Sequence, residues 1–300
     1  MSKEATRDGF GKAIKEIDDE DVFVLTADLG GSTRVNDFKQ KHPDRFIQVG
    51  VAEQNLVTVA SGLAKMGKKP FATSFAAFSP GRNWEQIRTT ICYNDQPVKI
   101  VSTHAGIGVG EDGATHQMLE DIAMMRSLPN MRVVSPCDAQ QAEQATKAIK
   151  DIDKPVYMRL NRQSTKNVSN GFTYGEAEIL TRGDDLTLIT TGPPTIEADK
   201  AVKELDVSIE HINIHTIKPL DTETIVESAK RTGSVMTVED HQINGGLGSA
   251  VTELLSQHHP TSVKRHGIKD AFGESGDHEE LYEKYELDKE GIKQEIQTFL

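Results

Sequence analysis

The fold and a ligand site are both indicated by one stretch of the chain, Val101-Ser-Thr-His-Ala-Gly-Ile-Gly-Val-Gly-Glu-Asp-Gly-Ala-Thr-His-Gln117. It continues a short apolar run, residues 98–102, that is typical of a buried strand. Glycines at positions 106, 108, 110 and 113 then allow the backbone to approach a ligand closely. His104, Asp112 and His116 lie within thirteen residues of this stretch, a grouping that packing alone explains poorly. A ligand-binding loop after a strand is therefore expected here.

A dinucleotide site is one alternative for a glycine-rich loop, and the order of the residues argues against it. The dinucleotide fingerprint opens a helix at its last glycine and places an acidic residue about 20 positions further on. Neither feature follows Gly113.

Short β-branched runs alternate with helical stretches along the whole chain, which is the pattern of a parallel α/β sheet. The expected strands are residues 22–27, 70–74, 98–102, 132–135, 156–159, 186–190, 208–214, 234–238 and 262–265. The expected helices are residues 7–17, 53–65, 80–92, 118–127, 139–149, 195–205, 221–231 and 247–257. We predict an α/β protein of two domains, 1–168 and 186–300, each a mainly parallel sheet flanked by helices. Segment 169–185 is expected to be a linker, and the charged tail 277–300 a solvated amphipathic helix.

Composition excludes several classes of partner. The formal net charge is −12, with 34 Lys and Arg against 46 Asp and Glu, which argues against nucleic-acid binding. Cys92 and Cys137 lack metal-like neighbour spacing and are expected to be buried free thiols. The N-terminal residues form no apolar signal region, and no run approaches the ~20 apolar residues of a membrane span. A cytoplasmic protein that does not enter a membrane is expected.

Upstream of the loop, one glutamate and two phenylalanines admit both a structural and a functional interpretation. Glu53 opens the expected helix 53–65, where a carboxylate favours the helix N-terminus electrostatically. Burial there would raise its pKa and allow it to share a proton with a ligand. Phe75 and Phe78 are three residues apart, a spacing that suits either a core or a ring-binding pocket.

Together these segments resemble the pyrimidine-binding half of a thiamine-diphosphate enzyme, and most closely transketolase. The resemblance rests on Asp44-Arg-Phe-Ile-Gln-Val-Gly-Val-Ala-Glu-Gln54, on Thr73-Ser-Phe-Ala-Ala-Phe-Ser-Pro80 and on the stretch that ends at Gln117, and it covers essentially the whole chain. It implies that Glu53 drives the imino tautomer of the cofactor, which deprotonates the thiazolium C2.

The same resemblance implies a cofactor pocket and a substrate site. Phe75 and Phe78 would form the pocket for the aminopyrimidine ring, and Asp28, after the first strand, would help to shape it. Alanine at position 72 departs from the family, in which many members have a further aromatic residue there.

In the substrate site that the resemblance implies, Asp112 would contact a substrate hydroxyl, and His116 would reach the donor's C1 hydroxyl and reacting carbon. The substrate phosphate would be bound by four residues, Arg7, Ser32, His104 and Arg162. Arginine suits this role because its planar fork donates two hydrogen bonds to one phosphate.

One element of the family is missing from the sequence. No Gly-Asp-Gly segment followed by an asparagine, the element that holds Mg²⁺ and the cofactor diphosphate, occurs in the chain. The resemblance therefore implies that this chain is the C-terminal subunit of a split transketolase. A separate N-terminal subunit would ligate Mg²⁺, no residue here would be a metal ligand, and two copies of each chain (α2β2) would form the enzyme. The implied reaction is reversible transfer of a two-carbon ketol unit from a ketose phosphate to an aldose phosphate.

Three other functions remain open at this stage. A 1-deoxyxylulose-5-phosphate synthase-like enzyme shares Ala52-Glu-Gln54 and a Thr-His-Gln segment, although His104 and Gly110-Glu-Asp112 favour transketolase. A 2-oxo-acid dehydrogenase β subunit has a similar size but lacks the Gly-Glu-Asp-Gly-x-Thr-His pattern. A non-catalytic module of the same fold is disfavoured because Glu53, Asp112 and His116 are all present.

A second glycine-rich segment, Glu239-Asp-His-Gln-Ile-Asn-Gly-Gly-Leu-Gly-Ser249, lies in the second half of the chain. A glycine-rich turn that opens a helix is able to bind an anion through free N–H groups. The family has a similar segment with no known catalytic role, so we interpret this one as structural.

Overall fold

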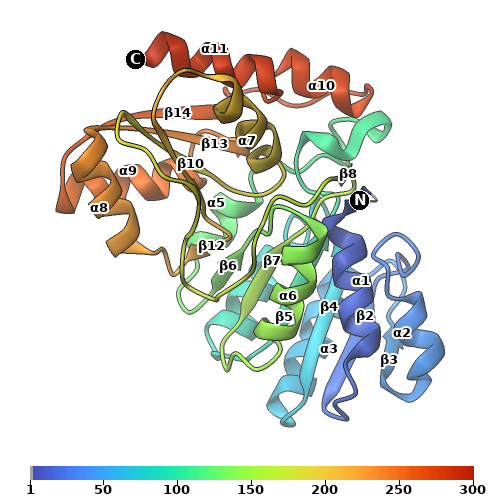
Figure 1. Cartoon of the computed structure of the whole chain (residues 1–300). Coiled ribbons are helices and arrows are strands. Elements are labelled where there is room, and N and C mark those ends of the chain that lie inside the picture. The colour runs from blue at the N-terminus through green and yellow to red at the C-terminus, as the bar shows by residue number, and fades with distance from the viewer. Residues whose placement is uncertain (1–2) are drawn as a thin grey trace.

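The computed structural model describes residues 3–300 and arranges them around two sheets (Figure 1). Both sheets are mainly parallel and are flanked by helices, which confirms the predicted fold class. The helices 53–65 and 139–149 and the strands 156–159 and 186–190 have the bounds that the sequence predicts.

The first sheet has the strand order β12-β6-β7-β5-β4-β2-β3. Its parallel strands are β2 (Val22–Thr26), β3 (Phe46–Gln48), β4 (Lys69–Phe75), β5 (Lys99–Thr103), β6 (Arg132–Val134) and β7 (Val156–Arg159). The exception is β12 (Thr216–Lys218), which comes from the second half of the chain and pairs antiparallel with β6. The two halves of the sequence thus share one sheet.

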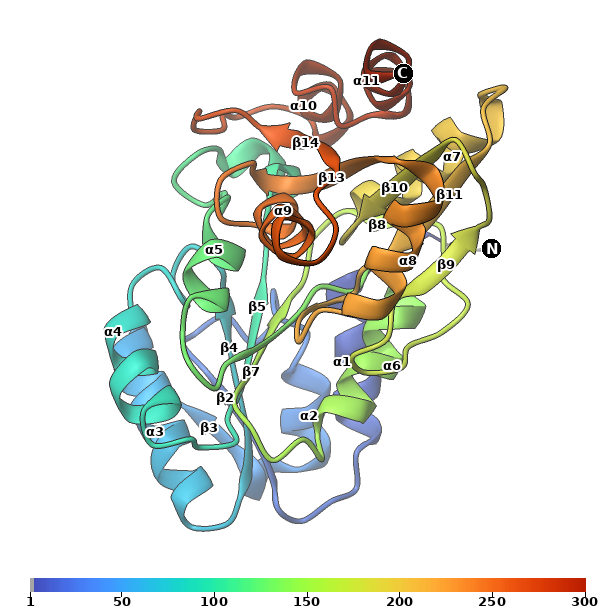
Figure 2. The ribbon, with the colours of Figure 1, turned by 90° about the vertical axis from the view of Figure 1, so that its left-hand side faces the viewer.

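Helices cover both faces of this sheet because its strands are apolar on both sides. Val24 and Phe71 pack on one face and their neighbours Leu25 and Ala72 on the other. Figure 2 shows α1 (Thr6–Glu16), α2 (Asn36–Lys41) and α6 (Ala139–Ile149) on the first face. It shows α3 (Glu53–Lys65) and α4 (Trp84–Gln86), which continues into a π-helical turn over Ile87–Cys92, on the opposite face. The remaining helix of this half is α5 (Asp121–Arg126).

The second sheet has the strand order β14-β13-β10-β11-β9. Its parallel strands are β10 (Leu186–Thr190), β11 (Ile209–Asn213), β13 (Ser234–Gln242) and β14 (Ser262–Ile268), and β9 (Glu178–Thr181) runs antiparallel to β11. Its helices are α7 (Pro194–Glu204), α8 (Thr222–Thr232), α9 (Leu247–His258), α10 (His278–Lys284) and α11 (Lys289–Phe299).

Short elements complete the chain. A two-stranded ribbon joins β1 (Glu4–Ala5) to β8 (Ser164–Thr165) in antiparallel pairing. Two 3₁₀ segments cover Pro43–Arg45 and Ile107–Asp112. No helix within residues 3–300 is long and apolar enough to cross a membrane.

The tail is not the solvated helix that the sequence predicts. It forms two helices, α10 and α11, and Leu281, Ile292 and Ile296 are buried in the core of the second domain. Figure 1 shows both helices lying over this domain. The prediction is wrong because the four-residue spacing of Ile292 and Ile296 forms an apolar stripe that packs on α7.

Two further elements differ from the sequence-based expectation. The expected linker contains β9, whose residue Ile179 packs against the core of the second sheet. The helix expected over 80–92 begins only at Trp84. A side chain on Gly81 would lie 2.1 Å from the Ala77 carbonyl oxygen, so the backbone is closely folded there. The side-chain amide of Asn83 donates a hydrogen bond to the Glu53 carbonyl oxygen at 2.8 Å. The chain therefore turns tightly before the helix begins.

Candidate functional site

The candidate site lies at the carboxyl ends of β2, β4, β5 and β7, where open α/β sheets bind ligands. Three non-glycine residues in this region have left-handed backbone conformations: Asp28 (φ 61°), Arg34 (φ 64°) and His104 (φ 58°). Such conformations carry strain and concentrate at functional sites. The backbone geometry of these loops therefore agrees with a site at this edge of the first sheet.

Glu53 is the first residue of α3 and is only 1% exposed. Its Oε2 accepts a hydrogen bond from Arg82 Nη1 at 2.7 Å. The Arg82 guanidinium also lies 4.8 Å from the centroid of the Phe78 ring. A buried carboxylate is stabilised by such a charged partner. The sequence reasoning missed Arg82, because its contact with Glu53 depends on the tight turn before α4.

The two phenylalanines bring both histidines of the loop together. Phe75 and Phe78 have ring centroids 5.9 Å apart and an interplanar angle of 17°. Phe75 also stacks on His104, with centroids 3.8 Å apart. The His116 ring meets Phe78 edge-on, with centroids 5.5 Å apart. Residues from the end of β4 and from the loop after β5 thus form one aromatic group, which Arg82 links to Glu53.

Arg7 connects three of the residues predicted to bind phosphate. Its Nη1 lies 3.2 Å from the Ser32 carbonyl oxygen and 3.1 Å from His104 Nε2. His104 Nδ1 lies 2.8 Å from Thr103 Oγ1. Arg7 Nε is buried and has no hydrogen-bond partner within residues 3–300. An unpaired guanidinium N–H of this kind suits an anionic ligand.

The electrostatics of this group keep His104 neutral. Burial, followed by the positive charges of Arg7 and Arg162, lowers the pKa of His104 to about 3. His104 therefore accepts a hydrogen bond from Arg7 through Nε2 and donates through Nδ1 to Thr103. Burial, followed by the charge of Arg34, also lowers the pKa of Arg7. Arg34 is a second residue that the sequence reasoning missed, and it stands two positions after Ser32.

The rest of the loop presents polar groups toward solvent. Arg162 Nη1 donates to the Val109 carbonyl oxygen at 3.0 Å and to Asp112 Oδ2 at 3.3 Å. His116 Nδ1 lies 3.0 Å from Thr115 Oγ1. These contacts place the predicted phosphate ligand Arg162 beside the predicted hydroxyl ligand Asp112.

Two predicted residues are less directly involved. Asp28 exchanges hydrogen bonds with Gln48, at 2.8 Å through its N–H and 3.2 Å through Oδ1, and within residues 3–300 it forms no hydrogen bond or ion pair with another predicted site residue. Ser32 joins the group through its carbonyl oxygen rather than its hydroxyl. Among residues 3–300, no group of three or more His, Cys, Asp or Glu side chains is arranged to hold a metal ion.

Comparison with known proteins connects both domains to one family. The family model "Transketolase, pyrimidine binding domain" matches residues 2–167, and "Transketolase, C-terminal domain" matches residues 175–292. A transketolase C-terminal section of Methanocaldococcus jannaschii is 44% identical, over 97% of this chain and 94% of that protein. A 6-deoxy-6-sulfo-D-fructose transketolase subunit of a Clostridium species (strain MSTE9) is 40% identical, over 90% of this chain and 85% of that protein.

A solved structure agrees in fold and in length. A "split gene transketolase, inactive beta4 tetramer" superposes with a TM-score of 0.92 at 43% identity, covering 99% of this chain and 98% of that one. A 1-deoxy-D-xylulose-5-phosphate synthase of Caldanaerobacter subterraneus is 36% identical over 98% of this chain, which corresponds to only 49% of that enzyme.

Proposed function

This chain belongs to the transketolase family, and from that premise we propose that it is the C-terminal subunit of a two-chain transketolase. The enzyme would transfer a two-carbon ketol unit from a ketose phosphate to an aldose phosphate. The observation that carries the proposal is that Arg82 links buried Glu53 to the aromatic group of Phe75, Phe78 and the two loop histidines.

The residues present fit the aminopyrimidine ring of thiamine diphosphate. Such a ring needs an aromatic surface and a carboxyl group near a ring nitrogen. The near-parallel Phe75 and Phe78 rings supply the first and Glu53 supplies the second. Thiamine diphosphate, when bound, would supply the carbon nucleophile on which the transfer depends. When the cofactor binds, Arg82 would release Glu53, because the guanidinium and the aminopyrimidine ring would bind the same carboxyl group.

The other residues would bind and orient the sugar. Arg7, neutral His104 and Arg162 would hold the phosphate, and the unpaired Nε–H of Arg7 is one donor for it. Asp112 and His116 would orient the hydroxyl groups at the reacting end. Hydrogen bonds from His116 would strengthen as charge develops on the substrate oxygen. Ser32 and Asp28 would support these contacts from the loop after β2.

A partner chain is part of the proposal. The N-terminal subunit would ligate Mg²⁺ and the cofactor diphosphate, in an α2β2 enzyme located in the cytoplasm. The relatives named as a C-terminal section, as a subunit and as a split-gene product support this arrangement. The relative that acts on a sulfo-sugar indicates that the anionic group of the donor differs between members. Within this range of donors we propose a ketose phosphate, without naming the sugar.

A 1-deoxyxylulose-5-phosphate synthase-like reaction is the second candidate, because such an enzyme matches nearly the whole chain. That reaction consumes pyruvate, so the donor that is consumed separates the two candidates.

The test combines this chain with its N-terminal partner, Mg²⁺ and thiamine diphosphate, and supplies xylulose 5-phosphate and ribose 5-phosphate. We expect no turnover by this chain alone and turnover by the pair. Glu53→Gln should lower kcat by roughly a thousandfold, since loss of an essential proton-sharing group typically removes 10²–10⁴-fold. The matched control is Glu85→Gln, on exposed Glu85 of the neighbouring α4, which should leave kcat unchanged. Turnover by the single chain, or consumption of pyruvate in place of the ketose, would refute the proposal.

A further inference from the structure

The loop that carries Asp112 and His116 packs on one side against the second domain. Figure 1 shows α10 beside the end of the first domain where this loop lies, and α10 packs against the 3₁₀ segment Ile107–Asp112. The loop is therefore not held by its own strand alone.

Asp240, at the end of β13, makes the most direct contact. Its Oδ1 accepts a hydrogen bond from the Ile107 N–H at 2.8 Å, and its Oδ2 accepts one from the Tyr282 hydroxyl at 3.3 Å. Asp240 is 1% exposed and Tyr282 4% exposed. A side chain on Gly106, where φ is +81°, would lie 2.0 Å from Asp240 Oδ2. The loop backbone thus lies directly against this carboxyl group.

Further contacts hold the loop along its length. Gln117 Nε2 donates to the Ile107 carbonyl oxygen at 3.0 Å and to the Glu274 carbonyl oxygen at 2.9 Å. A side chain on Gly113 would lie 2.4 Å from Ser275 Oγ. The start, middle and end of the loop are therefore all in contact with the second domain.

Asp240 itself is fixed from the first domain. Arg159 Nη2 donates to the Asp240 carbonyl oxygen at 2.7 Å, and Arg159 Nε donates to Asp121 Oδ2 at 2.9 Å. All three residues are at most 1% exposed. Arg159 therefore holds the backbone of Asp240 in place through buried hydrogen bonds of a charged side chain.

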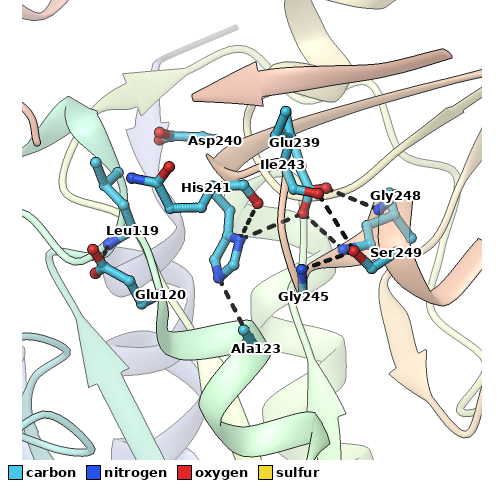
Figure 3. Close-up of polar contacts among 12 residues, drawn as sticks. Leu119, Glu120, Ala123, Glu239, Asp240, His241, Ile243, Gly245, Gly248 and Ser249 are labelled. Carbon is cyan, nitrogen blue, oxygen red and sulfur yellow. Dashed lines mark hydrogen bonds and ion pairs between the residues drawn. The ribbon is translucent and has the colours of Figure 1, made fainter. Parts of the chain in front are cut away.

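Glu239, the residue before Asp240 in β13, points its side chain away from the loop and toward α9 (Figure 3). Figure 3 shows the side chains of Asp240 and Glu239 pointing in opposite directions. Glu239 accepts hydrogen bonds from the N–H groups of Leu247 and Gly248, at 2.7 and 2.8 Å. These bonds satisfy the N-terminus of α9 internally, in agreement with the structural interpretation of this segment. Glu239 therefore offers a matched control for Asp240.

We propose that the second domain sets the geometry of the substrate loop, with Asp240 and Tyr282 as positioning residues. The contacts are independent of the proposed function, and only the claim that the loop meets the sugar rests on it. A misplacement of about 1 Å in a substrate-orienting group lowers a rate by about a hundredfold. Asp240 would therefore affect the reaction rate by holding the loop, and with it Asp112 and His116, in position.

The first test measures hydrogen exchange of backbone amides in the full chain without its partner. In Asp240→Ala we expect exchange across residues 107–117 to accelerate about tenfold or more, because the Ile107 N–H loses a buried acceptor. Exchange in α3 should remain unchanged. Asp240→Asn retains an acceptor oxygen and should be intermediate, and Glu239→Gln should leave the loop as in the wild type. Unchanged loop exchange in Asp240→Ala, or equal acceleration across the whole chain, overturns the proposal.

The second test uses the assembled enzyme. Asp240→Asn and Tyr282→Phe should lower kcat/KM for the sugar donor about tenfold or more and leave the affinity for thiamine diphosphate, measured by calorimetry, unchanged. Equal loss of both quantities would indicate a general structural role and overturn the proposal. If the wild-type pair has no transketolase activity, the proposed function fails, and the exchange experiment still decides whether Asp240 holds the loop.

Discussion

At the scale of the residue, the site depends on Arg7. Its side chain contacts both the loop after β2, through the Ser32 carbonyl oxygen, and the loop after β5, through His104. The resemblance to transketolase, rather than any of these residues alone, predicted that Arg7, Ser32 and His104 belong to one site. The Arg82 and Glu53 pair was not predictable in the same way, since it depends on the turn at Gly81 and Asn83.

Replacement of Arg7 should separate recognition of phosphate from chemistry. Arg7→Ala should raise KM for a ketose phosphate about 10–100-fold, because a hydrogen bond to a charged group contributes about 1.5–3 kcal/mol. Arg7→Lys should recover part of this loss, since lysine keeps the charge and loses the fork. The measurement compares KM for xylulose 5-phosphate with KM for xylulose. Equal increases for both sugars would contradict the assignment.

At the scale of the element, helices with a polar N-cap and an apolar stripe were the most predictable. Helix α6 has the expected bounds because Asp138 caps it and Ala142, Ala145 and Ile149 form its buried face. Strand β9 was not predictable, since four half-buried residues carry little periodic signal and depend on pairing with β11. The same limit applies to β12, whose partner β6 lies in the other half of the sequence.

The Asp138 cap should contribute more stability than an ordinary cap. Its carboxyl group accepts hydrogen bonds from the N–H groups of Gln141, Val168 and Ser169, at 2.8–2.9 Å, and it is fully buried. Asp138→Ala should lower the free energy of unfolding by about 3–5 kcal/mol, because several buried donors lose their acceptor.

The matched control for this change is Asp288→Ala. Asp288 caps α11 through one hydrogen bond, from the Gly291 N–H at 3.0 Å, so its loss should cost about 1 kcal/mol. Urea denaturation of both variants provides the comparison. If the two variants lose similar free energies of unfolding, the hydrogen bonds from Val168 and Ser169 to Asp138 add no stability beyond an ordinary cap, and the prediction is wrong.

At the scale of the whole molecule, burial is the largest influence on the pKa of several histidines. Burial lowers the pKa of His211 and of His215 to about 4, and His104 is neutral for the reason given above. In the unfolded chain these groups titrate near 6.5. Between the two values the unfolded state binds protons that the folded state does not. The free energy of unfolding should therefore fall as pH decreases below about 6.5.

His211 provides the test of this pH dependence. From pH 7 to pH 5 it should account for a loss of about 2 kcal/mol, which His211→Gln should remove. Burial raises the pKa of Glu239 and Asp240, and these groups act in the opposite direction. Their contributions to the pH dependence are the same in the variant and in the wild type, so they cancel when the free energies of unfolding from urea denaturation are compared. His258→Gln, on the surface of α9, should keep the wild-type slope, and a similar slope in His211→Gln would contradict the prediction.

Strand β12 also determines how far this protein tolerates being cut. A fragment that stops near residue 170 would retain six strands of the first sheet but would leave the backbone groups of β6 without their antiparallel neighbour. Exposed strand edges recruit other chains and promote aggregation. In the proposed enzyme the cofactor site is divided between two polypeptides, but a second break between the two domains of this chain would expose a strand edge. The two domains are therefore expected to fold as a single unit.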